Sequence, residues 1–138
     1  MPLEILTEPW AAAWCRALNE SETYRAAAAS WEGAVAIVMT ADPAQGVAER
    51  RAVHLDLWHG TCRGSRVATD ADLAQARYVL QASPAVWNQL LDGSLDAVAA
   101  VMAGKLSLVR GSLASLLPYV GAAKALVAAA ARLDAASS

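Results

Sequence analysis

The stretch from Trp87 to Gly111 constrains the fold more than any other part of the chain. Glycines at 93 and 104 divide it into two short apolar segments and a run at 105–110 with β-strand character. Glycine often ends a helix because it adopts the left-handed conformation without steric cost. The pattern therefore predicts two short helices followed by a strand. None of its side chains is arranged for nucleophilic or acid–base chemistry, which points to a container for an apolar molecule.

Composition limits the partners of the chain. The net charge is −2 and no basic run is present, which argues against nucleic acid because phosphate binding needs clustered Lys and Arg. We see no apolar run approaching the roughly 20 residues of a membrane span, and no signal peptide at the start. Hydrophobic residues make up 57% of the chain. Abundant alanine explains much of this value, and apolar side chains lining an internal cavity are a second, compatible explanation.

Hydrophobic periodicity and turn residues predict one α+β domain over residues 1–138. The first helix starts after Thr7 and a second, opened by Ser21, ends before Gly33. Residues 70–73 are expected to be a short connection. Helices capped by Ser83 and Ser94 end at the glycines at 93 and 104. An alanine-rich helix after Ser112 is interrupted at Pro118 and Gly121 and frays from Asp134 onward. Strands are expected at 34–40, 51–58, 62–69, 76–82 and 105–110.

The reactive side chains do not form a recognisable catalytic or metal-binding motif. His59 and Cys62 lie near Asp56 without a known ligand spacing, and His54 points to the opposite face of its strand from His59. We therefore expect no catalytic residue, no metal and no cofactor. Cys15 and Cys62 are too few for a disulfide framework, so we expect two reduced, half-buried thiols in a cytoplasmic protein.

Two further sets of side chains have a structural and a functional interpretation. Arg63, Arg66 and Arg77 either solubilise an exposed sheet face, which we favour, or hold a lipid carboxylate or phosphate. Trp10 and Trp14 lie one turn apart on the first helix, where they either anchor the core or contact a membrane. That helix has no basic face, so packing in the core or in a dimer is favoured.

The order of these elements resembles the SCP2-type sterol transfer family, in the form of its bacterial single-domain members. The likeness covers nearly the whole chain, although the middle strands match only in pattern. It departs from the family at Gly111-Ser112, where Gly-Asp is common, and at the C-terminus, which does not resemble a peroxisomal signal. The residues that carry the likeness most specifically are Ser83, Trp87, Leu90, Leu91, Gly93, Leu95, Asp96, Met102, Gly104, Lys105, Leu106, Leu108 and Gly111, with Asn19, Tyr24, Ala28, Trp31 and Gly33 upstream.

The resemblance implies a five-stranded mixed sheet with helices packed on one face and an apolar tunnel between them. It further implies non-catalytic binding and transfer of an apolar lipid: a sterol, fatty acid, acyl-CoA or phospholipid. The small side chains of the alanine-rich helix leave volume over the sheet, which agrees with a tunnel. We expect the tunnel to be lined by Ile37, Met39, Leu55, Leu57, Trp87, Leu90, Leu91, Leu95, Val98, Val101, Met102, Leu108, Leu116 and Val120.

Two other functions stay open at this point. In the first, the cavity is filled and an exposed apolar surface makes a homodimer or binds an enzyme. In the second, the chain is an enzyme acting on acyl-CoA or a related lipid, for which the sequence offers no nucleophile or base. Transient contact with a membrane is compatible with lipid transfer. The sequence names neither the lipid nor its head group.

Overall fold

The computed structural model describes residues 6–137, and its central strand is β1 (Val35–Met39). All five residues of β1 are buried, as expected for an apolar run without alternation that is covered on both faces. It pairs antiparallel with β2 (Arg51–Trp58) and parallel with β4 (Tyr78–Ala82). The edges are β3 (Thr61–Val67) and β5 (Ser107–Arg110), in the order β3-β2-β1-β4-β5. The expected five-stranded mixed sheet is confirmed.

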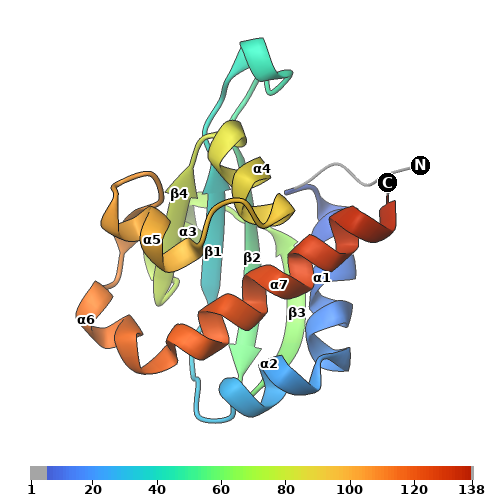
Figure 1. The fold of residues 1–138 in the computed structure, drawn as a ribbon, viewed down its shortest axis with the longest axis vertical. Coiled ribbons are helices and arrows are strands. Elements are labelled where there is room, and N and C mark those ends of the chain that lie inside the picture. The colour runs from blue at the N-terminus through green and yellow to red at the C-terminus, as the bar shows by residue number, and fades with distance from the viewer. Residues whose placement is uncertain (1–5, 138) are drawn as a thin grey trace.

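Nearly all the helices cover one face of this sheet (Figure 1). The long α7 crosses that face diagonally and packs against α1, α2, α4 and α5. The exceptions are α3 (Asp70–Gln75), whose Leu73 packs on the opposite face, and the short 3₁₀ helix η1 (Pro43–Gln45) in the connection between β1 and β2. The helices on the covered face are α1 (Glu8–Glu20), α2 (Glu22–Ala27), α4 (Pro84–Asp92), α5 (Ala97–Met102), α6 (Leu113–Leu116), the 3₁₀ turn η2 (Leu117–Tyr119) and α7 (Val120–Ser137).

The alternation of β2 divides the molecule into a large and a small apolar cluster. Val53, Leu55 and Leu57 face the helices, as their spacing predicts, and are almost fully buried. The other face carries a smaller cluster around Val38, where His54 is also buried. The main core, and with it the space available for a ligand, therefore lies on the helix side.

The two tryptophans of α1 belong to this main core. Trp10 and Trp14 are each 2% exposed, and their ring centroids lie 4.9 Å apart. The indole Nε1 of Trp14 donates a hydrogen bond to the carbonyl oxygen of Leu126 in α7, 3.0 Å away. The interpretation as core anchors is confirmed for both residues.

Several expected element boundaries are wrong. The expected connection at 70–73 is instead α3, and α2 ends at Ala27 because the chain turns before Gly33. Asp96, not Ser94, caps α5, since its carboxylate accepts from the amide of Ala99. The chain is interrupted at η2, as Pro118 predicts, but α7 continues through Gly121 to Ser137. The fraying expected from Asp134 onward stays a prediction, and Ser138 lies outside the described residues.

The expectation of two free thiols is also wrong. Cys15 of α1 and Cys62 of β3 form a disulfide, with their Cα atoms 5.4 Å apart. The two residues are 47 positions apart, and the packing of α1 beside β3 brings them together. Stable disulfides are rare in cytosolic proteins, so the cysteines no longer favour a cytoplasmic location.

One helical stretch corrects the expectation that no segment could span a membrane. Residues Leu113–Leu133 are long and apolar enough to do so by length and composition, with a mean hydropathy of 1.6. Within this stretch α7 buries Ala122, Ala125 and Leu126 in the main core. Only 28% of the apolar window is buried, so packing over the core accounts for part of its apolar composition and not for all of it.

Candidate functional site

Two apolar cavities lie between the sheet and the segment α6–α7. The first, here called the aromatic cavity, has a volume of about 40 Å³ and is lined by Tyr24, Trp31, Val35, Leu57, Tyr78, Leu80, Leu116, Tyr119, Ala122, Ala123 and Leu126. The second, called the α5 cavity, has a volume of about 60 Å³ and is lined by Trp14, Ile37, Leu80, Trp87, Ala97, Val98, Val101, Leu106, Leu113, Leu116, Val120, Ala123, Leu126 and Val127.

A shared wall separates the two cavities. Leu80 of β4, Leu116 of α6, and Ala123 and Leu126 of α7 line both of them. A water molecule needs about 10–15 Å³ of such space, so each cavity admits only a few waters. A long lipid chain fits neither of them unless this wall moves. Joined, the two cavities would form one apolar channel along the sheet.

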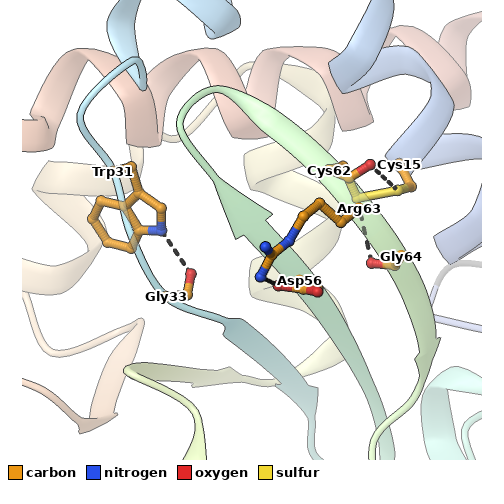
Figure 2. Close-up of polar contacts among 7 residues, drawn as sticks. All are labelled: Cys15, Trp31, Gly33, Asp56, Cys62, Arg63 and Gly64. Atoms are coloured by element: carbon orange, nitrogen blue, oxygen red, sulfur yellow. Dashed lines mark hydrogen bonds and ion pairs between the residues drawn. A yellow bond between two sulfur atoms is a disulfide. The ribbon is translucent and has the colours of Figure 1, made fainter.

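Packing among three aromatic side chains shapes the first cavity. The Trp31 ring lies 5.2 Å from that of Tyr78 and meets that of Tyr119 edge-to-face at 4.8 Å. The Tyr78 hydroxyl forms a 2.5 Å hydrogen bond with Ser115 Oγ of α6, and the Trp31 Nε1 donates to the carbonyl oxygen of Gly33 (Figure 2). The polar atoms of these rings thus have partners outside the cavity, which leaves apolar ring surface facing it.

The α5 cavity has a similar construction around two indoles. The Trp87 Nε1 donates to the carbonyl oxygen of Val38 in β1 at 2.9 Å, and Trp14 is held by its bond to Leu126. Ser83 caps α4 and Gly93 ends it in the left-handed conformation, both as predicted. These local signals set the ends of α4, and the bond from Trp87 to Val38 places this indole on the inner side of the helix, against β1.

The chemistry of the lining is that of a container. It includes no His, Cys, Asp, Glu, Lys or Arg. Burial raises the pKa of Tyr24 to about 12, so this phenol is neutral at physiological pH. Among the described residues, no group of three or more His, Cys, Asp or Glu side chains is placed to hold a metal ion.

Seven of the fourteen side chains expected to line a tunnel lie in the walls of these cavities. Leu57 lines the aromatic cavity and Leu116 lines both. The other five line the α5 cavity, and they are Ile37, Trp87, Val98, Val101 and Val120.

The other seven lie outside both walls. Met39, Leu55, Leu90 and Leu91 are buried and pack in the solid part of the core. Leu95 and Leu108 are half-buried against its border, and Met102, the last residue of α5, is 73% exposed.

Sequence reasoning missed the aromatic wall and the residues shared between the cavities. Tyr78 and Leu80 alternate toward the helix side of β4, so the strand pattern contained a signal for them. Trp31 is one of the residues that carry the family likeness, but nothing in the sequence placed it in a cavity wall. Tyr119 had no signal, because it lies in the 3₁₀ turn η2 and meets Trp31 only in the folded chain.

The polar candidates lie elsewhere. His54 is buried on the opposite sheet face, its Nδ1 without a hydrogen-bond partner, and burial, followed by the charge of Arg66, lowers its pKa. His59 forms a 2.6 Å contact with Glu32 at the surface. Cys62 is in the disulfide, which removes it as a thiol nucleophile or metal ligand.

Comparison with solved structures shows close likeness in fold. A crystal structure of sterol carrier protein 2 matches with 46% identity and a TM-score of 0.85, over 93% of this chain and 98% of the other. A conserved hypothetical protein from Thermus thermophilus, described as possibly a sterol carrier protein, matches with 45% identity and a TM-score of 0.83, over 94% and 90%. The fold is also shared with sterol carrier protein 2 of Aedes aegypti, solved with palmitate, at 13% identity and a TM-score of 0.56, over 92% and 98%.

The family comparison agrees with these structures. A search of curated proteins finds no match. The family model for SCP-2 sterol transfer proteins matches residues 13–119, which include both edges of the sheet and most of the cavity walls. The chain belongs to the SCP-2 sterol transfer family.

Proposed function

We propose that this protein binds the apolar chain of a lipid between its sheet and helices α4–α7, and carries it without chemical change. The observation that carries the proposal is the pair of adjoining apolar cavities whose common wall consists of four side chains. Burying a lipid chain contributes about 0.8 kcal/mol per methylene, which for a long chain exceeds the cost of association. The palmitate held by the Aedes aegypti protein makes a fatty acid the first ligand to test.

The segment α6–η2 is where we place ligand entry. Its Leu116 belongs to the shared wall, while the neighbouring Leu117 is 55% exposed. The α-helical part is only four residues long and is followed by Pro118, so few backbone hydrogen bonds hold it. Displacing this segment would join the cavities, and Leu117 would then meet the membrane or protein from which the lipid comes.

The proposal is tested by lipid uptake in a variant that fills the shared wall. Ala123→Phe places a large ring between the cavities, whereas Ala128→Phe adds the same ring at an exposed position of the same helix. Native mass spectrometry and displacement of a fluorescent fatty acid should show uptake by the wild type and Ala128→Phe. We expect Ala123→Phe to bind at least tenfold more weakly. Absence of uptake by the wild type, or equal uptake by both variants, would contradict the proposal.

The small cavity volumes favour one alternative, an interaction module of the same fold that holds no lipid. In that case the cavities of about 40 and 60 Å³ are packing defects and the protein acts through its surface. Sedimentation equilibrium distinguishes the two functions. A stable dimer that neither contains nor takes up lipid supports the alternative, whereas a lipid-loaded protein excludes it.

A further inference from the structure

Arg77 occupies an unusual position beside the aromatic cavity. Its guanidinium carbon lies 5.0 Å from the centroid of the Trp31 ring and 5.6 Å from that of Tyr78, within the range of cation–π contact. Both rings line the cavity and are nearly fully buried, whereas Arg77 itself is exposed. Arg77 does not itself line the cavity, so its guanidinium lies on the solvent side of two rings that do.

The charge of Arg77 is not matched by a carboxylate among the described residues. Its Nη1 donates to the backbone carbonyl oxygen of Glu32 at 2.5 Å, while the Glu32 carboxylate binds His59 at 2.6 Å. A guanidinium has five N–H donors, so the bond to a neutral carbonyl leaves most of its capacity available. Arg77 can thus accept an anion without first breaking an ion pair.

Arg63 and Arg66, the two other arginines considered from the sequence, differ from Arg77 because each is paired with a carboxylate. Arg66 binds both oxygens of Asp72, at 2.6 and 3.1 Å. Arg63 reaches across to Asp56 on the neighbouring strand at 3.0 Å, as Figure 2 shows. Both thus fit the expected role of solubilising the sheet, and neither contacts a ring that lines a cavity.

The backbone next to Arg77 is shaped to admit its side chain. Gly33 has a φ of +129°, and a Cβ there would lie 2.8 Å from Cδ and 3.0 Å from Cβ of Arg77. A side chain at position 33 would therefore push the arginine away from the rings. The position of the guanidinium thus depends on local sequence at two sites far apart in the chain.

We propose that Arg77 binds the anionic head group of a lipid whose chain enters the aromatic cavity past Trp31 and Tyr78. This inference rests on the proposed function and adds the ligand class: a single-chain lipid ending in a carboxylate or phosphate. Guanidinium recognises both groups through paired charge-assisted hydrogen bonds, and the aromatic rings beside it accept the first methylenes of the chain. A neutral lipid of equal length gains binding free energy only from burial of its chain in the cavity.

The test compares head groups on one chain length. Isothermal titration calorimetry at pH 8 measures the affinity of the wild type, Arg77→Gln and Arg63→Gln for dodecanoate, dodecyl phosphate and dodecanol. Arg63 is the matched control because it too is exposed and stacks on a tryptophan, at 5.0 Å from Trp58, away from the cavities. We expect wild type and Arg63→Gln to bind an anionic ligand at least tenfold more tightly than dodecanol. In Arg77→Gln this ratio should fall to about one.

The ratio between ligands, measured within one protein, separates recognition from any loss of stability in the variant. A preference for dodecanoate would assign the site to free fatty acids, and a preference for dodecyl phosphate to a phosphate head group. Equal binding of all three ligands by the wild type would overturn the head-group site and leave the proposed function standing. Absence of binding by any of them would overturn both.

Discussion

At the scale of single residues, Gly111 shows how tightly the aromatic wall is built. It ends β5 with a φ of +95°, and a Cβ at this position would collide with Cδ1 and Cε1 of Tyr78. The next residue, Ser112, caps α6. Gly111 therefore permits both the turn into α6 and the close contact with a ring that lines the aromatic cavity.

We predict that Gly111→Ala destabilises the fold more than Gly93→Ala. Both glycines have positive φ, but Gly93 has open space around it, so its substitution costs only the backbone strain of about 1 kcal/mol. At Gly111 the overlap with Tyr78 adds about 1–3 kcal/mol. Urea unfolding followed by tryptophan fluorescence measures both losses in the free energy of unfolding. Equal losses would mean that the Tyr78 ring moves aside without cost.

At the scale of elements, strand patterns were more informative than helix patterns. The alternation in β2 correctly predicted its bounds and the inward face with Val53 and Leu55, because successive side chains of a strand point to opposite faces. The other face is covered as well, so burial along β2 does not alternate. The six-residue α3 was missed because a short polar helix has no apolar stripe. Its signal lies in its cap, since Thr69 and Asp72 form a reciprocal capping box.

The stability contributed by α3 should depend on pH through Asp72. Hydrogen bonds from Arg66 and then from the amide of Thr69 hold the pKa of Asp72 well below its ordinary value. A carboxyl with a lowered folded-state pKa stabilises the fold above its unfolded pKa, near 4, and loses this effect as pH falls further. Asp72→Asn should therefore be less stable than wild type at pH 7, with the difference shrinking below pH 4.

The matched control is Asp70→Asn, at the first position of the same helix. The Asp70 side chain is 97% exposed, and its contact with Arg50 is 3.4 Å long, so little stability depends on it. Thermal unfolding of the two variants between pH 3 and 7 compares them with wild type. A pH-independent deficit in Asp72→Asn would show that its effect comes from the altered cap and not from the charge.

At the scale of the whole molecule, the topology could be predicted from sequence and the cavities could not. The number of strands, the mixed sheet and the single helix-covered face follow from patterns within each element and from the family resemblance. The shape of an internal space depends instead on which side chains from distant elements meet. Leu80, Ala123 and Leu126 come from β4 and α7 and form the shared wall only after the sheet and α7 are packed together. Met39 and Leu55 point to the same side of the sheet, but neighbouring side chains fill the space over them.

The Cys15–Cys62 bridge joins α1, one of the helices on the covered face, to the edge strand β3. Since Trp14 next to it lines the α5 cavity and bonds to Leu126 of α7, the bridge also fixes one side of the cavity. A disulfide closing a loop of this size stabilises a fold by about 2–4 kcal/mol, chiefly by restricting the unfolded chain. Its loss should therefore lower the melting temperature by about 10 °C.

We predict this decrease both for wild type in reductant and for the double variant Cys15→Ser/Cys62→Ser. Differential scanning calorimetry with and without reductant measures it, and the double variant is its own control because reductant should not shift its melting temperature further. Alkylation followed by mass spectrometry reports the bridge directly: without reductant, no thiol should be modified. Free thiols in protein purified under oxidising conditions, or equal melting of reduced and oxidised wild type, would mean that packing of α1 on β3 holds this edge without the covalent link.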